Sequence, residues 1–342
     1  MSTRAARWLW SLAPRATRVV RAGARTSALV IVRHHRVYAA TERPLYRLGV
    51  AESVLRDQLA MLAREELTPV TVAEGLAHLD SGEPGVRVAM SFDDGYRDNL
   101  TRALPLLTRH GARATLFLAA GLIEDRRAPW WDVLAHALET TVATVLPPLP
   151  GITTTAMPLE GPAARRETLA RLIPALKIEP RTREARLAAV RETLGIRDAA
   201  SCALARWEEL PAWTAAGGEI GAHTLTHPHL TTLDPAEQRR EIAGSVTLIE
   251  RRLGVRVAGF AYPGGDHDAT TVAVTRESGP GYAVTTRAGV ATAASPRFEL
   301  PRRGFSEGTC LGPGGRFSRR LALAELDGVF DRMRAARDGV AS

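Results

Sequence analysis

Lysine is almost absent from this 342-residue chain, which has one, Lys177, among 45 basic residues. The sequence therefore favours neither Schiff-base catalysis nor a lysine-containing phosphate loop. Cysteine is also scarce. Cys202 and Cys310 lie far apart and form no metal motif or disulfide framework, so we expect two free thiols. Aromatic residues reach only 5%, and no apolar run approaches the roughly 18 residues that a membrane-spanning helix needs.

Acidic residues are missing from the first 36 positions, which hold eight arginines. The rest of the chain contains 37 basic and 37 acidic residues, so the net charge of +8 belongs to this segment and predicts no nucleic-acid groove in the fold. Because its apolar pieces are short and interrupted by Pro14 and by arginines, we do not expect this segment to act as a signal peptide. We expect a flexible basic arm over residues 1–27 and a cytoplasmic protein. Alternatively, Trp8 and Trp10 give the arm weak peripheral contact with an anionic membrane surface.

Short apolar runs alternate with segments of helical periodicity along the rest of the chain. The runs are apolar throughout rather than at every second residue, which is typical of parallel strands buried on both faces. We expect strands at 27–32, 87–92, 114–120, 217–223, 257–263, 282–286 and 298–305, and helices at 52–67, 99–111, 235–253, 268–278 and 319–337. This alternation predicts an α/β fold in which helices cover a parallel sheet, closed or open.

Residues 121–205 break this rhythm. A Trp-Trp segment is followed by a Pro-rich link at 147–162 and by helical stretches rich in Arg, Ala and Leu at 163–177 and 181–194. We interpret 121–205 as a helical insertion in one domain that covers residues 28–337.

Two adjacent carboxylates, Asp93 and Asp94, follow the apolar run "RVAMSF". In parallel α/β folds, functional side chains gather where strands end. A cation beside one carboxylate would cancel its charge and leave the other free to act as a base. Gly95 allows the tight turn that points both side chains into one pocket. The alternative for "DDGY" is a surface β-turn.

The stretch "HTLTH" supplies two histidines, His223 and His227, at the end of another predicted strand. Histidines four apart share one face of a helical turn, so we expect a helical turn here and one metal bound by both rings. A carboxylate from the pair at 93–94 would complete a site of two histidines and one oxygen, with a position left for water.

"SFDDGY" followed by "HTLTH" resembles the first two motifs of the polysaccharide deacetylases, the NodB-homology carbohydrate esterases of family 4. Further pieces fit the subgroup with a Trp-Trp helical insertion: "RHHRV", "PWWDVL", "GGEIGAHTLTHPHL", "GFAYPGG", "YAVTTRAG" and "LPR". Together they extend from about residue 28 to 305.

This resemblance implies a distorted (β/α) barrel and metal-dependent removal of an acetyl group from an N-acetylated sugar in a polysaccharide or glycan precursor. By position, Asp93 is the general base. The metal, usually Zn²⁺, is bound by Asp94, His223 and His227. The backbone N–H of Tyr96 helps to hold the oxyanion.

The sequence departs from the family pattern at two roles. Most members carry the general acid as a histidine in a late strand, but no histidine follows His267 here. In members that open with a similar "HRV" strand, the early histidine fills that space, so His35 is the candidate acid. "FAYPGG" also lacks the arginine that orients the base, and Arg302 of "LPR" is the candidate substitute. The alternative for His35 is a strand-end histidine that bonds only to backbone.

Two other functions stay open at this stage: a catalytically degenerate barrel that binds glycan, and a metal-dependent amidohydrolase that acts on a non-sugar amide. A glycosidase fits poorly, because its two carboxylates must flank a bond and come from separate strands about 5 Å or more apart.

Overall fold

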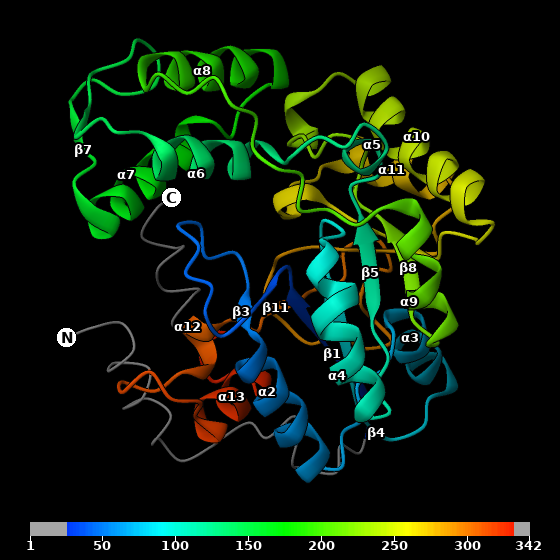
Figure 1. Ribbon diagram of the computed structural model, residues 1–342. Helices are drawn as coiled ribbons and strands as arrows, with labels where there is room; N and C mark the ends of the chain where they lie inside the picture. Colours follow the sequence, from blue (N-terminus) through cyan, green and yellow to red (C-terminus); the bar gives the residue numbers. More distant parts are fainter. Residues whose placement is uncertain (1–25, 332–342) are drawn as a thin grey trace.

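The computed structural model describes residues 26–331, so almost the whole predicted arm lies outside the described residues. Seven parallel strands form one sheet in the order β10-β9-β8-β5-β4-β1-β11 (Figure 1). Their bounds are β1 (Ser27–His34), β4 (Gly85–Phe92), β5 (Thr115–Leu118), β8 (Glu219–Ala222), β9 (Gly259–Ala261), β10 (Tyr282–Val284) and β11 (Arg303–Gly304). The predicted parallel α/β architecture is confirmed, although most strands are shorter than their apolar runs.

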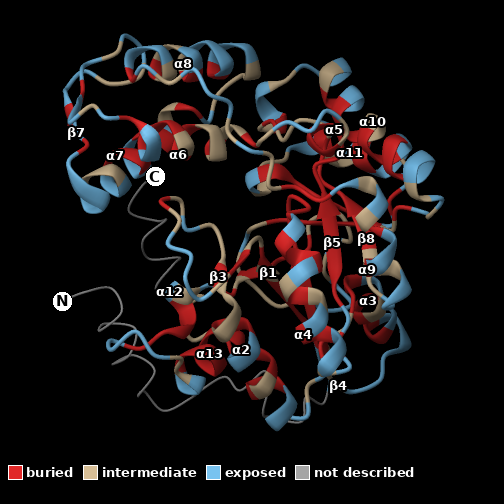
Figure 2. Ribbon diagram, in the orientation of Figure 1, coloured by how far each residue is buried: buried red, intermediate tan, exposed pale blue. Residues whose placement is uncertain are grey.

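The sheet is buried on both faces, as the continuous apolar runs predict. On β1, Leu29 and Ile31 pack into one hydrophobic cluster, while Val30 and Val32 pack into another, because successive side chains point to opposite faces. The first cluster also contains apolar residues of α3 (Val72–Ser81). The second contains apolar residues of α2 (Glu52–Arg64), α4 (Leu104–Arg109) and α10 (Pro235–Leu253). Figure 2 shows this burial concentrated in the strands.

The two edges of the sheet are linked by the segment that leads into β11. Leu300 donates its N–H to Ala283 of β10 at 3.0 Å and accepts one from Thr285 at 2.8 Å. Three residues later, Arg303 pairs with Val32 of β1 at the other edge. The sheet is therefore curled into a distorted (β/α) barrel, as predicted, and the segment predicted as a strand at 298–305 is the link.

Short elements and helices complete the barrel. Two-stranded pairs form between β2 (Val37–Tyr38) and β3 (Val50–Ala51), which are parallel, and between β6 (Val145–Leu146) and β7 (Met157–Pro158), which are antiparallel. Outside the group described next, the other helices are a π-helical turn at Asn99–Ala103, α5 (Ala120–Glu124), α9 (Pro211–Ala215), α11 (Ala269–Glu277), α12 (Glu307–Cys310) and α13 (Arg319–Leu326), with 3₁₀ turns at Trp207–Glu209, Leu230–Thr232 and Pro263–Gly265.

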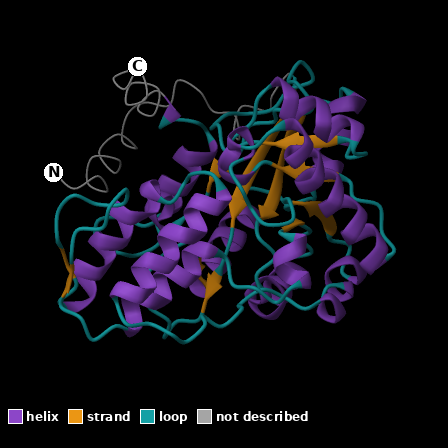
Figure 3. Cartoon of the chain, turned by 90° about the horizontal axis from the view of Figure 1, so that it is seen from above, coloured by secondary structure: helices purple, strands orange, loops and turns teal. Residues whose placement is uncertain are grey.

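A separate group of helices lies within the region predicted as an insertion. It consists of α6 (Trp130–Thr140), α7 (Gly161–Ala175) and α8 (Pro180–Thr193), which lie together at the upper left of Figure 1. These helices bury their own cluster of apolar side chains, including Leu134, Leu172 and Val190. Figure 3, seen from above, shows helices flanking the strands. The boundaries proposed for the arm, the barrel and the insertion stay predictions.

Two smaller expectations are also resolved. Cys202 and Cys310 form no disulfide bond within residues 26–331. Among residues 26–331, none of the helices combines the length and the hydropathy needed to cross a bilayer.

Candidate active site

The register of the sheet brings the candidate catalytic and metal-binding residues together at the carboxyl-terminal ends of the strands. In the β1–β4 pairing, His34 lies opposite Phe92, so His35 and Asp93 both follow the ends of neighbouring strands. β5 lies next to β4 and pairs with β8, which His223 follows. Residues from three distant segments of the chain therefore meet where the parallel strands end.

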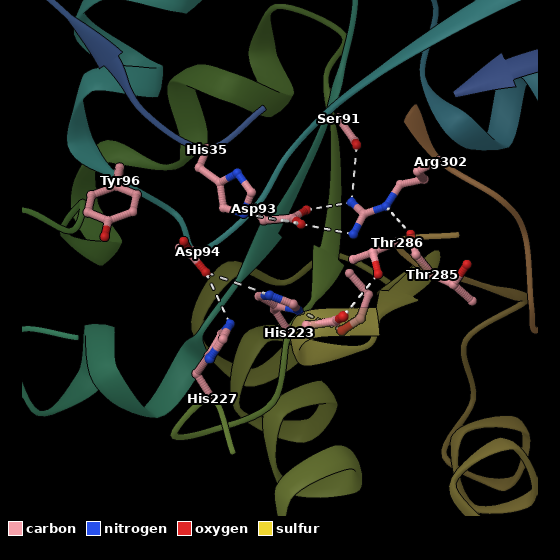
Figure 4. Close-up of polar contacts among 12 residues, drawn as sticks. His35, Ser91, Asp93, Asp94, Tyr96, His223, His227, Thr285, Thr286 and Arg302 are labelled. Carbon is pink, nitrogen blue, oxygen red and sulfur yellow. Dashed lines mark hydrogen bonds and ion pairs between the residues drawn. The ribbon is translucent and has the colours of Figure 1, made fainter. Parts of the chain in front are cut away.

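Asp94, His223 and His227 converge on one point (Figure 4). Oδ1 of Asp94 lies 3.6 Å from Nε2 of His223 and 3.5 Å from Nε2 of His227. The ligand atoms of all three side chains lie within 4.8 Å of one another. Asp94 and His223 are almost fully buried, at 1% and 2% exposure. This group is the candidate metal site.

Hydrogen bonding fixes which nitrogen of His223 faces the cluster. Nδ1 of His223 lies 2.6 Å from the carbonyl oxygen of Ala261, which only accepts hydrogen bonds, so Nδ1 carries the proton and donates it. Nε2 therefore presents its lone pair to the space beside Asp94. An imidazole held by a backbone carbonyl in this way is the usual arrangement of a metal-binding histidine.

The carboxylate of Asp94 fits a cation. Neither of its oxygen atoms has a hydrogen-bond partner among the described residues, although both are buried. Burial raises the pKa of Asp94 well above its usual value, and the nearby charges of Asp93 and Asp132 raise it further. A buried, unpartnered carboxylate is costly unless a positive charge compensates it. Two imidazoles and one carboxylate are a donor set that Zn²⁺ and similar divalent cations accept.

Asp94→Asn is therefore expected to stabilise the metal-free protein by about 1–2 kcal/mol, because a neutral amide removes the uncompensated buried charge. Urea unfolding in the presence of a chelator measures the effect. Asp98→Asn is the control. Asp98 accepts hydrogen bonds from Arg36 at 2.9 Å and from the backbone of Val37 at 3.0 Å, so its loss is expected to destabilise the protein. A metal-free Asp94→Asn protein less stable than the wild type would contradict this account.

The histidine stretch is not helical, so the prediction of a helical turn was wrong. Residues 223–229 form a loop, and Thr224 and His227 have φ values of 66° and 57°, in the left-handed region. The hydroxyl of Thr224 accepts the N–H of His227 at 3.0 Å and fixes this turn. The two imidazoles lie edge to face, with ring centroids 4.8 Å apart, because of the loop and not because of helical spacing.

Glu241 of α10 holds this loop from the outside, a role that the sequence analysis missed. Its carboxylate accepts the N–H groups of Leu225 and Thr226, both at 2.9 Å, and the hydroxyl of Thr226 at 2.8 Å. Glu241 is buried and lies one position before the buried Ile242. An acidic residue next to the apolar face of a predicted helix was the signal that could have identified it.

Asp93 turns away from Asp94 and pairs with Arg302 (Figure 4). Nη1 and Nη2 of Arg302 donate to the two carboxylate oxygens at 2.6 and 2.9 Å. The guanidinium also donates to Ser91 Oγ at 3.2 Å and to the carbonyl of Thr285 at 2.9 Å, and it is 1% exposed. Burial alone would raise the pKa of Asp93, but the charge and hydrogen bonds of Arg302, together with His223 and His35, outweigh burial and lower the pKa well below its usual value. Asp93 is therefore ionised at neutral pH.

His35 lies on the open side of Asp93. Its Nε2 is 3.9 Å from Oδ2 of Asp93, and its side chain is 20% exposed. Burial of the ring lowers the pKa of His35 to about 3, which outweighs the opposing charge of Asp93. The carbonyl of His35 accepts a hydrogen bond from Asn99 at 2.7 Å. The neighbouring His34 faces elsewhere and contacts Gln58, so the structure separates the two histidines of the pair.

The backbone N–H of Tyr96 is available to a ligand at the site, whereas its side chain is engaged in hydrogen bonds within the protein. The phenol hydroxyl donates to Asp132 at 3.0 Å and accepts from the indole of Trp131 at 2.8 Å, and the ring is fully buried. The backbone N–H of Tyr96 donates no hydrogen bond to any residue within 26–331. An unpaired N–H two positions after Asp94 is available to an anionic oxygen at the site.

The turn after β4 needs the glycine at position 95. Asp94 and Gly95 have φ values of 73° and 80°. A Cβ on Gly95 would lie 2.9 Å from a methyl carbon of Leu118 and 3.0 Å from one of Ile123, so no side chain fits. Asp94 itself holds the left-handed conformation, which costs a non-glycine residue of order 1–3 kcal/mol. Such strain commonly accompanies functional sites.

The Trp-Trp pair contributes packing at the edge of the site. Trp131 is buried and contacts the ring of His227, with ring centroids 4.5 Å apart. Trp130 contacts Trp131 edge-on at 5.5 Å and is partly exposed. Trp131 therefore packs against the histidine loop, and of the two rings only that of Trp130 is partly exposed.

Together, the fold and the site define an α/β barrel with a candidate divalent-metal centre at the ends of its strands. A family model described as polysaccharide deacetylase matches residues 81–283. The chain belongs to the polysaccharide deacetylase family, and the resemblance noted in its motifs is confirmed. The family assigns it to the hydrolases that act on glycans.

Solved structures of deacetylases share the fold. IcaB from Ammonifex degensii has a TM-score of 0.55 at 19% identity, over 88% of this chain and 97% of that chain. The deacetylase PplD from Streptococcus pyogenes, in complex with acetate, has a TM-score of 0.54 at 18% identity, over 81% and 92%. The de-N-acetylase from Aggregatibacter actinomycetemcomitans has a TM-score of 0.51 at 14% identity, over 80% and 94%. No protein with a curated description matches the chain.

Proposed function

We propose that the protein is a metal-dependent deacetylase that hydrolyses the acetamide of N-acetylated sugars in a polysaccharide or glycan precursor. One observation carries this proposal. The buried oxygens of Asp94 face His223 and His227 without a hydrogen-bond partner among the described residues, while the adjacent carboxylate, Asp93, is held ionised. The proposed cation is Zn²⁺, bound by those three residues. When bound, it would supply Lewis-acid polarisation of the acetamide carbonyl and would acidify water at the site.

Asp93 is the proposed general base. Its carboxylate takes the proton of the attacking water, and Arg302 positions it through the bidentate contact. Because Arg302 also lowers the pKa of Asp93, the base is ready in its ionised form at neutral pH.

The backbone N–H of Tyr96 is the proposed donor to the oxyanion that develops as water adds to the carbonyl. A backbone donor in this position needs no reorganisation during the reaction, and the tight turn through Asp94 and Gly95 fixes its direction.

His35 is the proposed general acid, which protonates the sugar nitrogen as the C–N bond breaks. At rest the low pKa leaves His35 neutral, so it must gain its proton during the cycle. Asp93, protonated by then and 3.9 Å away, is the nearby source. Water and the amide are thus converted to acetic acid and an amine, which at neutral pH become acetate and an ammonium group with no net loss of protons.

The test is acetate release from a panel of N-acetylated oligosaccharides with added zinc, cobalt or nickel, and with a chelator as control. We expect metal-dependent release from at least one glycan. Glycan binding without any release would indicate a degenerate barrel, and release from simple non-sugar amides alone would indicate a different amidohydrolase. Either result would contradict the proposal.

A further inference from the structure

A second concave site lies beside the candidate metal centre, between α8 and α10. It is a cleft of about 560 Å³ that includes the start of α6. Its lining is rich in arginine, with Arg126, Arg127, Arg181, Arg183, Arg191 and Arg240. Glu179, Glu184, Glu237 and Glu241 also line it.

Arg183 is the residue that distinguishes this cleft from an ordinary charged surface. Its side chain is 3% exposed, and neither Nε nor Nη1 has a hydrogen-bond partner within residues 26–331. Its guanidinium carbon lies 5.6 Å from the ring centroid of Trp130. A cation–π contact does not satisfy N–H donors, so a buried guanidinium with free donors in a cleft is suited to an anionic ligand.

Three of the carboxylates that line the cleft have hydrogen-bond or ion-pair partners other than Arg183. Glu241 holds the histidine loop with three hydrogen bonds. Glu179 caps the N-terminus of α8 through the N–H groups of Arg181 and Thr182. Glu184 pairs with Arg127 at 3.1 Å. Arg240 is exposed, and its side chain makes no hydrogen bond or ion pair with another described residue. Glu184, Glu241 and Glu179 are close enough to oppose the lowering of the pKa of Arg183 by burial. The lining nevertheless contains more arginines than glutamates, and Arg183 keeps two N–H donors without a partner among the described residues.

The cleft is connected to the candidate active site. Thr226, which lies between the two histidines of the metal site, is part of its lining. Side-chain contacts also lead from Arg183 to Trp130, from Trp130 to Trp131 and from Trp131 to His227. An anion bound against Arg183 would therefore lie next to the loop that carries the two histidines.

We propose that this cleft binds an anionic oxygen group, a phosphate or a carboxylate, carried by the glycan substrate. The assignment to a substrate rests on the proposed deacetylase function, whereas binding of the anion does not. The planar guanidinium of Arg183 is the principal contact, and Arg240 contributes charge at the rim.

Binding is tested on the full chain by calorimetric titration with inorganic phosphate, glucuronate and neutral glucose. We expect phosphate or glucuronate to bind and glucose not to bind. Arg183→Met is expected to weaken the affinity for the anion about 10- to 100-fold. Arg186→Met is the matched control, because Arg186 lies on the same helix, bonds to the carbonyl of Ala175 and is not part of the cleft. Absence of anion binding to the wild type, or equal binding by Arg183→Met, would overturn the proposal.

A second pair of variants guards against misfolding of Arg183→Met. Arg240→Gln and Arg239→Gln change adjacent exposed residues of α10, of which only Arg240 lines the cleft. Arg240→Gln is expected to weaken anion binding several-fold and Arg239→Gln to leave it unchanged. Equal behaviour of the two variants would count against the site.

The substrate assignment is tested by acetate release from N-acetylglucosamine 6-phosphate and from a neutral N-acetylglucosamine oligomer. The measured quantity is kcat/KM for the phosphorylated substrate divided by kcat/KM for the neutral substrate. Arg183→Met is expected to lower this ratio about tenfold or more, mainly by raising KM for the phosphorylated substrate. Arg186→Met is expected to keep the wild-type ratio. An unchanged ratio in Arg183→Met would show that the anion bound in the cleft is not part of the substrate. Absence of acetate release from every glycan would reject the deacetylase function instead, and the titrations would still decide whether the cleft binds anions.

Discussion

Asp93→Asn is expected to lower acetate release about 10²–10⁴-fold while the protein keeps its metal. The amide cannot accept the proton of water, but the three proposed ligands are unchanged. The substitution has a structural cost as well, because Arg302 is 1% exposed and its carboxylate partner is lost. Breaking a buried pair from one side costs about 3–5 kcal/mol. Acetate assays, metal analysis and urea unfolding measure the three effects separately.

The double variant Asp93→Asn with Arg302→Met separates catalysis from stability. It removes both members of the buried pair, so it is expected to recover much of the stability lost by Asp93→Asn. It is not expected to recover activity, since the base is still missing. Arg302→Met alone is expected to reduce activity, and its effect should vanish in the Asp93→Asn background because Arg302 acts through Asp93. Undiminished acetate release by Asp93→Asn would remove Asp93 as the base.

His35→Ala is expected to slow hydrolysis of the sugar acetamide about 10²–10⁴-fold. An amine cannot leave as an anion, so the amide reaction needs the proton that His35 supplies. An activated acetate ester, such as 4-nitrophenyl acetate, has a leaving group that needs no proton. The same variant should therefore slow ester hydrolysis far less, and the ratio of the two rates isolates the acid step.

Two results would contradict this role of His35. Equal slowing of amide and ester would indicate that His35 supports the site structurally. An unchanged rate of amide hydrolysis would show that His35 has no catalytic role and is only a histidine at the end of a strand. His229→Ala is a matched control. His229 follows the second histidine of the metal site by two residues, but its Nδ1 lies 3.9 Å from Oδ2 of Asp266, which has no proposed catalytic role. This variant should leave both rates unchanged.

The sequence predicted the sheet and the strand ends well, because continuous apolar runs and helical periodicity are local signals. Helix α10 was expected near 235–253 and has those bounds. Helix α3 was missed, although Thr71 and Glu74 form a capping box immediately before an apolar stretch. That signal was present in the sequence and could have identified the helix.

The geometry of the site was less accessible to sequence reasoning. Two histidines four apart suggested a helical turn, but tertiary contacts hold the loop with Thr224 and His227 in left-handed conformations. The pairing of Arg302 with Asp93 joins residues 209 positions apart, so it was anticipated from the family resemblance of "LPR" and not from a local pattern. Likewise, the burial of Arg183 depends on how α8 packs beside Trp130, which periodicity does not specify.

The central claim is that Asp94, His223 and His227 bind one divalent cation on which acetate release depends. Elemental analysis of the metal in purified wild-type protein, His223→Ala and the control His229→Ala tests it most directly. The account predicts one divalent cation per chain in the wild type and in His229→Ala, and almost none in His223→Ala. A His223→Ala protein that retains its metal, or a wild-type protein that binds none when zinc is supplied, would contradict it.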